Sequence, residues 1–263
     1  GAKIKIADNV TINLTDALNI GENFRTSDRK WIGEAYTDLT KFSEPVVVSE
    51  SIFNGRQLTI VNYENITIKG GMNSHVVVDP AYAFVLNFVN CTNITIENLT
   101  MGHTEEGYCT GGVIGLTNSS AITIRSCDMY GCGAYGIVSQ DSPFLMEKSI
   151  IRDCSYGIMQ LFGVKHAEFN ECDFFRNREF SMVEIDGNSS SIQFNNCRFA
   201  QNQGVLFAVD TDIEIRNSEI HHPTADGFGS ENNILIDEAT GVFVDNKPLE
   251  DRGIGPKRGY SAY

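Results

Sequence analysis

The chain has 263 residues, a formal net charge of −14 and a sequence pI near 4.7. Proteins that bind nucleic acid by neutralising phosphates carry a basic stripe, so this acidic chain is not expected to have nucleic acid as a partner. The sequence contains no apolar run of about 18 residues or more, and therefore predicts no transmembrane helix.

The N-terminal segment, residues 1–45, is predicted to be a cap over one end of a repeat array. Lys3-Ile4-Lys5-Ile6 alternates and indicates a short strand, and residues 15–21 have a cap residue, helical apolar spacing and a final Gly, which predict a helix. Trp31 is expected to pack against the first coil, with ligand stacking as the alternative. Because the chain begins at Gly1 rather than Met, we expect an export signal to have been removed, and a secreted, periplasmic or cell-surface protein.

A repeated strand pattern organises residues 46–243. Residues 93–101, NITIENLTM, return as residues 121–129, AITIRSCDM, and further copies begin with the pairs Ile66/Ile68, Ile192/Phe194 and Ile213/Ile215. Each copy is followed by a second apolar run, such as residues 136–138 or 157–159. The apolar spacing is two, which indicates strands rather than helices. Equivalent short strands in successive repeats must stack in parallel, which predicts an all-β parallel β-helix of about eight to ten coils.

These residues carry a resemblance to a known superfamily. Ile94-Thr95-Ile96, Cys127, Cys172, Asn177 and Asn202, with Tyr135-Gly136-Ile137 and Tyr156-Gly157-Ile158 opening the second strands, resemble the right-handed parallel β-helix, or pectin-lyase-like, superfamily. The resemblance implies the fold. It does not fix an activity, because the superfamily includes polysaccharide lyases, glycoside hydrolases, tailspikes and adhesins.

The motifs of two enzyme groups in that superfamily are absent. The Asn-Thr-Asp, Asp-Asp, Gly-His-Gly and Arg-Ile-Lys motifs of the polygalacturonase-like group do not occur, nor does the Trp-Ile-Asp-His of the pectate-lyase-like group. No zinc-type CxxC pair occurs either. Cys127, Cys172 and Cys197 fall on one inward template position, which predicts a column of small buried thiols. After the array, residues 244–263 are Gly-rich and basic and are expected to pack on the last coil.

An acidic strip on the second strands is the predicted site. Aligning these strands by their apolar residues gives one outward column of Asp141, Phe162, Asp186 and Asp210, followed by Asp212, and a parallel column of Ser139, Gln160, Glu184 and Ala208. Carboxylates on adjacent coils would lie about 5 Å apart, as in a retaining glycosidase pair, and two residues along one strand about 6.5 Å apart, near the lower limit for an inverting pair.

The positions of these side chains in the acidic strip predict a role for each of them. Asp186, Asp210 and Glu184 are the predicted catalytic residues, with Asp141, Gln160, Phe162 and Asp212 contacting substrate. Such a strip could also hold Ca²⁺, which prefers carboxylate oxygens. The structural alternative is that Asp residues stand at turn entries for backbone reasons and the face is solvated.

Two further side chains complete the predicted substrate site. Arg125 lies in an outward column between Glu97 and Glu147, where it would neutralise a substrate charge or form an ion-pair ladder. His103, with Glu105 and Glu106, falls in a long turn that is expected to protrude and bind.

The sequence therefore predicts a carbohydrate-directed β-helix protein whose partner is a polysaccharide or glycan. Two hypotheses stay open. One is a polysaccharide lyase or glycoside hydrolase using the acidic strip, and the other is a non-catalytic glycan-binding or adhesin-type scaffold.

Overall fold

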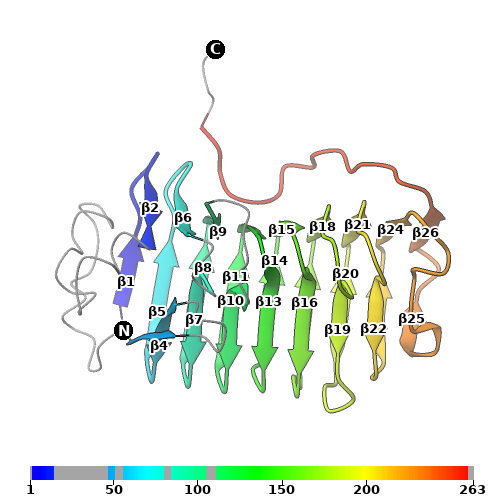
Figure 1. Ribbon diagram of the computed structural model, residues 1–263, viewed down its shortest axis with the longest axis horizontal. Helices are drawn as coiled ribbons and strands as arrows, with labels where there is room; N and C mark the ends of the chain where they lie inside the picture. The colour runs from blue at the N-terminus through cyan, green and yellow to red at the C-terminus, as the bar shows by residue number, and fades with distance from the viewer. Residues whose placement is uncertain (1, 15–46, 51–55, 80–83, 105–110, 260–263) are drawn as a thin grey trace.

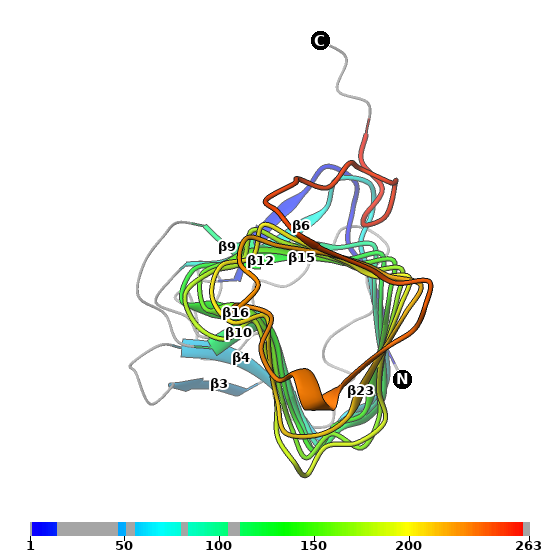
Figure 2. The ribbon, with the colours of Figure 1, turned by 90° about the vertical axis from the view of Figure 1, so that its right-hand side faces the viewer.

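The computed structural model describes residues 2–14, 47–50, 56–79, 84–104 and 111–259. These residues form a parallel β-solenoid of about seven complete turns, fewer than the eight to ten expected, with a partial turn at each end. Figure 2, a view along the solenoid axis, shows the sheets enclosing a single core. The predicted helix at residues 15–21 and Trp31 lie outside the described residues.

Each complete turn contributes one strand to each of three sheets, named A, B and C (Figure 1). Sheet A contains β1 (Ala2–Lys5), β5 (Glu64–Lys69), β8 (Thr92–Glu97), β11 (Ser120–Arg125), β14 (Phe144–Glu147), β17 (Ala167–Asn170), β20 (Ile192–Asn195), β23 (Ile213–Arg216) and β25 (Ile234–Ile236). Sheet B contains β2 (Thr11–Asn13), β6 (His75–Val78), β9 (Thr100–His103), β12 (Asp128–Gly131), β15 (Ile150–Cys154), β18 (Asp173–Phe175), β21 (Arg198–Ala200), β24 (Glu219–His222) and β26 (Gly241–Val244).

Sheet C contains β3 (Val47–Glu50), β4 (Arg56–Val61), β7 (Leu86–Val89), β10 (Gly111–Thr117), β13 (Ala134–Gln140), β16 (Gly157–Phe162), β19 (Val183–Ile185) and β22 (Phe207–Val209). All strand pairs are parallel except β3 with β4, which are antiparallel. A short 3-10 helix, η2 (Glu231–Asn233), precedes β25. None of the described segments forms a helix long and apolar enough to cross a bilayer.

The repeated strand pattern places its apolar residues in the core. Ile94 and Ile96 of β8 pair with Ile122 and Ile124 of β11, and all four side chains are buried. The intervening Thr95 points outward, because successive side chains of a strand alternate between its faces. Between sheets A and B the chain turns at Asn98, whose φ of 55° lies in the left-handed region that Asn adopts more readily than most residues.

Aromatic rings fill the C-terminal half of the core. Phe169 of β17 stacks on Phe194 of β20 with ring centroids 4.6 Å apart, and Phe174 of β18 lies 4.9 Å from Phe199 of β21. Cys127, Cys172 and Cys197 are buried and free, which confirms the predicted thiol column. Burying such large side chains is the main favourable term in the stability of the solenoid.

Residues 2–14 belong to the solenoid rather than to a cap. Ile4 of β1 pairs with Ile68 of β5, and Ile12 of β2 pairs with Val76 of β6. The physical reason is that Lys3-Ile4-Lys5-Ile6 has the same alternation as the repeated strand, so it continues sheet A by one strand.

The C-terminal tail, residues 245–259, does not stay on the last coil. It runs back over sheet B along the solenoid axis, as Figure 1 shows. The Gly255 amide donates to the Lys148 carbonyl at 2.9 Å, and the Gly259 amide donates to Asn73 Oδ1 at 2.9 Å. The tail departs from the expectation because its polar groups find partners in the turns between sheets A and B, along most of the solenoid.

We expect Phe194→Ala to lower the free energy of unfolding by about 3–5 kcal/mol, because it opens a cavity among stacked rings. Urea unfolding followed by circular dichroism measures the loss. Phe162→Ala, whose side chain is 40% exposed, is the matched control and should cost much less. Equal losses in the two variants would contradict this account of the core.

Candidate functional site

The outer face of sheet C carries the predicted acidic strip. Gln160 of β16 pairs with Glu184 of β19, which pairs with Ala208 of β22. The Asp186 amide donates to the Leu161 carbonyl, and the Asp210 amide donates to the Ile185 carbonyl, so the two aspartates follow matching strand ends. The sequence therefore placed Gln160, Glu184, Asp186 and Asp210 on the right columns.

Two residues were assigned to the wrong positions in these columns. Gln140, and not Asp141, pairs with Phe162, while Ser139 pairs with inward Leu161 and is itself buried. Aligning the strands by their apolar residues placed Ser139 opposite Gln160, but the strands pair with Tyr135 opposite Gly157 and Val138 opposite Gln160. The hydrogen-bond ladder fixes this register, and a shift of one residue exchanges the two faces of a strand.

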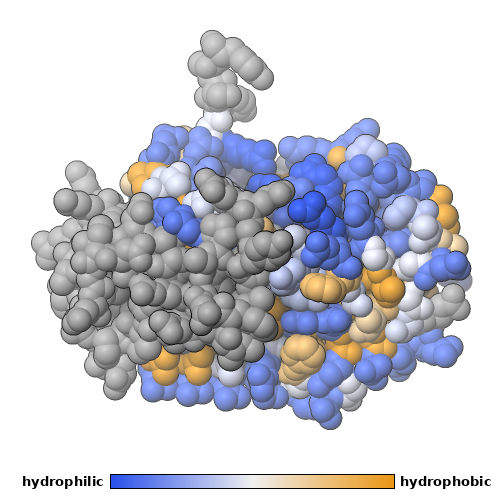
Figure 3. Space-filling model, in the orientation of Figure 1, coloured by the Kyte–Doolittle hydropathy of each residue, from blue (hydrophilic) through white to orange (hydrophobic). Residues whose placement is uncertain are grey.

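A shallow hollow of about 320 Å³ lies over β19 and β22. It brings together four of the predicted residues, and its lining is Phe162, Glu184, Ile185, Asp186, Ala208, Asp210 and Ser230. The face carries hydrophobic patches among hydrophilic side chains over the C-terminal half of the solenoid (Figure 3). Asp212 is exposed and follows Asp210, but it does not line the hollow.

Two neighbouring side chains hold the Glu184 carboxylate. Gln160 Nε2 donates to Glu184 Oε2, and the Tyr135 hydroxyl forms a second hydrogen bond with the same carboxylate. Burial, together with the negative charge of Glu184, raises the pKa of Tyr135, so the phenol stays protonated. Tyr135 reaches across one strand because the intervening residue is Gly157, where a Cβ would lie 2.6 Å from Tyr135 Cε1.

The Asp186 carboxylate is engaged in the turn that follows β19. It accepts hydrogen bonds from the Gly163 amide at 2.9 Å and from the Ser189 hydroxyl at 2.8 Å. Partial burial favours the neutral form, but these hydrogen bonds outweigh it and hold the pKa of Asp186 below its usual value. Asp186 is thus a stable carboxylate, suited to accept a hydrogen bond or a cation but not to donate a proton.

An aromatic row, defined by Tyr135, Tyr156 and Phe180, runs beside these acidic residues. The Tyr135 and Tyr156 ring centroids are 6.2 Å apart, and those of Tyr156 and Phe180 are 5.0 Å apart. The row starts at buried Tyr135 and ends at Phe180, which is 53% exposed. In the sequence, Tyr135 and Tyr156 appear only as part of the Tyr-Gly-Ile fold motif, and their recurrence in successive repeats was the signal that the rings lie near each other.

Arg125 lies on a different face. It is an outward residue of sheet A, where Lys69 contacts Glu97 at 3.2 Å and Arg125 contacts Glu147. The hydrogen bond with Glu147 raises the pKa of Arg125. The structure thus places Arg125 in an ion-pair ladder and does not bring it to the hollow.

His103 is the last residue of β9 rather than part of a protruding turn. Its side chain is buried, and a Cβ on Gly131 would lie 2.2 Å from His103 Nδ1, so the ring fits against this glycine. Glu105 and Glu106 lie outside the described residues. Side chains alternate between the two faces of β9, so His103 points to the same inward side as Met101. The ring therefore does not reach a binding surface.

A metal ion in the described part of the chain would need a cluster of ligating side chains. No group of three or more His, Cys, Asp or Glu side chains is arranged there to hold a metal ion. The Ca²⁺ site remains a prediction, with Asp186 and Asp210 as the carboxylates that would contribute to it.

Three sheets, whose strands pair in parallel apart from β3 with β4, surround a stacked apolar core. This arrangement defines the protein as a parallel β-solenoid. A family model described as a right-handed beta helix region matches residues 83–246, more than half of the chain. The chain therefore belongs to the right-handed β-helix family, which confirms the predicted fold. No curated protein matches the chain.

The Asp186 turn should contribute to acid stability. Because its folded-state pKa lies below the unfolded value of about 3.9, this carboxylate stabilises the fold above that pH, and the stabilisation is lost as the pH falls through the folded pKa. Asp186→Ala should therefore reduce the difference in Tm between about pH 7 and about pH 3, measured by circular dichroism. Asp212→Ala, which removes an exposed carboxylate that accepts no hydrogen bond within the described ranges, should leave the difference unchanged.

Proposed function

We propose that the protein binds a polysaccharide along the outer face of sheet C. The observation that carries the proposal is the aromatic row of Tyr135, Tyr156 and Phe180 next to the hydrogen-bonded Gln160–Glu184 pair. Sugar rings combine apolar C–H faces with hydroxyl groups, so they suit a surface where aromatic rings lie beside carboxylates and amides. Such a partner would place the protein outside the cell, in the periplasm or on the cell surface.

The row and the hollow have the geometry of an extended binding surface. Equivalent residues repeat at the interstrand distance of about 4.8 Å, so contacts recur along the solenoid axis. Phe180 and Phe162 are 53% and 40% exposed, and between them β19 presents Glu184. A chain of sugars lying along the axis would contact the rings on both sides and donate hydroxyl hydrogens to Glu184, Asp186 and Asp210.

Binding is favoured over catalysis by the state of the carboxylates. A glycosidase needs one carboxyl group whose raised pKa keeps it protonated and one that is ionised. Hydrogen bonds hold the pKa of Asp186 below its usual value, so this carboxylate is ionised, and Glu184 accepts hydrogen bonds from both Tyr135 and Gln160. These two carboxylates therefore offer hydrogen-bond acceptors for sugar hydroxyl groups, which supports binding.

A hydrolase or lyase is the second candidate function. It is supported by the spacing of Glu184 and Asp186, which are two residues apart at the end of one strand, and by Asp210 on the next strand. Strand geometry places the first two about 6.5 Å apart and carboxylates on adjacent strands about 5 Å apart, distances within the glycosidase range.

We expect Tyr156→Ala and Phe180→Ala each to weaken glycan binding by roughly two- to tenfold, the range that aromatic contacts contribute. Isothermal titration calorimetry with the best ligand from a glycan array measures the change, with and without added calcium. Phe243→Ala removes a ring that is 47% exposed at the C-terminal end of the solenoid, and it should bind like the unmodified protein. Unchanged affinity in both row variants would exclude sheet C as the binding surface.

Turnover distinguishes the two candidate functions. Incubation with uronate-containing and neutral glycans should give binding without new reducing ends or unsaturated products, and Glu184→Gln should still bind. Product formation that disappears in Glu184→Gln, while the variant stays folded, would establish the enzyme instead.

A further inference from the structure

The tail leaves a trough between itself and the outer face of sheet B. The trough has a volume of about 760 Å³, within the range of small-molecule sites, and its floor includes Arg152 of β15 and Phe175 of β18. A neighbouring hollow of about 360 Å³ shares Arg152 and Arg258 with it. This space lies on sheet B, apart from the aromatic row and the acidic strip of sheet C.

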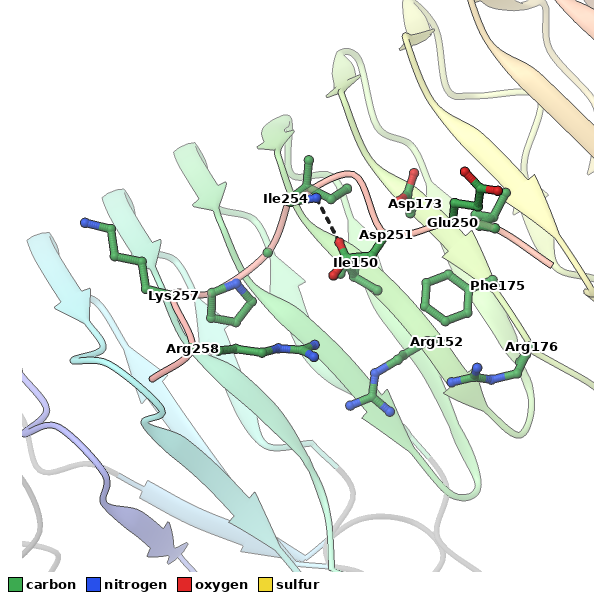
Figure 4. Close-up of a pocket in the computed structure, with 14 residues that line it drawn as sticks. Ile150, Arg152, Asp173, Phe175, Arg176, Glu250, Asp251, Ile254, Lys257 and Arg258 are labelled. Atoms are coloured by element: carbon green, nitrogen blue, oxygen red, sulfur yellow. Dashed lines mark hydrogen bonds between the residues drawn. The ribbon is translucent and has the colours of Figure 1, made fainter. Parts of the chain in front are cut away.

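Three guanidinium groups gather at one end of the trough. Arg152 donates to Asp128 at 2.9 and 3.0 Å and to Asp153 at 2.9 Å, and Arg176 donates to Asp153 at 2.8 and 2.9 Å. Arg258 of the tail lies 3.9 Å from Asp128 Oδ2. Figure 4 shows Arg258 extending from the tail toward Arg152 and Arg176, whereas Lys257 points away. The shared carboxylates therefore hold Arg152 and Arg176 in fixed positions.

The charges at this end do not balance. Three guanidinium groups face the two carboxylates of Asp128 and Asp153, which leaves one positive charge in a chain whose net charge is −14. Arg258 is 70% exposed and forms no hydrogen bond with any described residue; Arg176 lies over the Phe175 ring, and its Nη1 donates no hydrogen bond to a described residue. One excess positive charge with unused N–H donors matches a monoanion that accepts hydrogen bonds through two oxygens, such as a carboxylate or a sulfate ester.

The other end of the trough is acidic and polar. Asp173, Glu250 and Asp251 line the trough, and Figure 4 shows Asp173 and Glu250 on the side away from Arg258, with Asp251 beside Ile150. Asp173 is occupied by Arg198 and Arg252, but the Glu250 carboxylate accepts no hydrogen bond from a described residue. Carboxylates at this end would repel a second anion and accept hydrogen bonds from hydroxyl groups. A ligand that fits both ends carries one anionic group and several hydroxyl groups.

The tail is held in place independently of Arg258. Arg252 donates to the Asn196 carbonyl at 2.9 Å and contacts Asp173 at 2.9 Å, and the Gly255 amide donates to the Lys148 carbonyl at 2.9 Å. On the far side of Arg258, the Gly259 amide is bonded to Asn73. Because anchors lie on both sides, the trough is formed before a ligand arrives, which lowers the entropic cost of binding.

We propose that this trough is a second saccharide site, specific for an acidic sugar unit that bears a carboxylate or a sulfate ester, with Arg258 and Arg176 as the residues that bind the anion. Arg152 positions them through the carboxylates that it shares with each. The proposal does not rest on sugar binding at sheet C, since its residues come from sheet B and the tail.

The test uses the full chain and four probes: a uronic acid trisaccharide, its methyl ester, a neutral glucose trisaccharide and a sulfated disaccharide. Calorimetry should show binding of the uronate that weakens with salt, and at least about tenfold weaker binding of the methyl ester and the neutral sugar, since each loses a charge-assisted hydrogen bond. Binding of the sulfated probe with the same dependence on Arg258 would identify a sulfate ester as a second source of the anion.

Arg258→Gln and Arg176→Gln should each weaken uronate binding by about tenfold or more. Arg216→Gln is the matched control, because Arg216 is an exposed arginine, 54% accessible, that pairs with Glu214 on sheet A. Circular dichroism and Tm confirm that each variant is folded. The proposal is overturned if the acid and its ester bind equally, if neither anionic probe binds, or if both trough variants bind like Arg216→Gln.

One further variant separates this site from sheet C. Phe180→Ala, which shortens the aromatic row, should leave the arginine-dependent binding of the uronate probe unchanged. Loss of that binding in Phe180→Ala, with no loss in Arg258→Gln, would assign the uronate to sheet C and overturn the trough proposal. A protein that binds no glycan on sheet C can still bind the uronate here, so the two proposals can fail separately.

Discussion

The parallel hydrogen-bond ladder between successive coils is the constraint on which the rest of the structure depends. It holds equivalent residues of neighbouring turns at the interstrand distance of about 4.8 Å, so every position of the repeat becomes a column along the axis. Inward columns become the stacked core of Phe169 with Phe194, and Phe174 with Phe199. Outward columns become the surfaces, such as Gln160 with Glu184 on sheet C and Arg125 with Glu147 on sheet A.

Carboxylates have different surroundings on the outer faces of sheets C and B. On sheet C the carboxylates of Glu184, Asp186 and Asp210 line an open hollow, and Glu184 and Asp186 accept hydrogen bonds from a neighbouring side chain and a turn. On sheet B the carboxylates of Asp128 and Asp173 are nearly buried, and arginines from the next coils and from the tail compensate them. Removing one partner from such a buried pair leaves an uncompensated charge, so these pairs fix the position of the tail.

The candidate site was partly visible in the sequence. Glu184 and Asp210 were placed correctly, because an outward position next to an inward apolar residue is fixed by the period of two. Asp141 was misplaced, because outward Val138 is apolar and hides the true alternation of β13. The contact of Tyr135 with Glu184 could not be anticipated, since it crosses the intervening strand β16 and depends on the glycine, Gly157, that pairs with Tyr135 there.

The sequence by itself determined the architecture. A spacing of two within strands and a period of 21 to 28 residues between copies such as Ile94, Ile122 and Ile213 leave a parallel β-solenoid as the way to bury every copy. Only the tertiary structure decided the surfaces. The tail crosses sheet B because its amides and arginines meet carbonyls and carboxylates far away in the chain, as Gly259 meets Asn73. Such pairings depend on the path of the chain outside the repeat, so the periodic pattern of the sequence does not predict them.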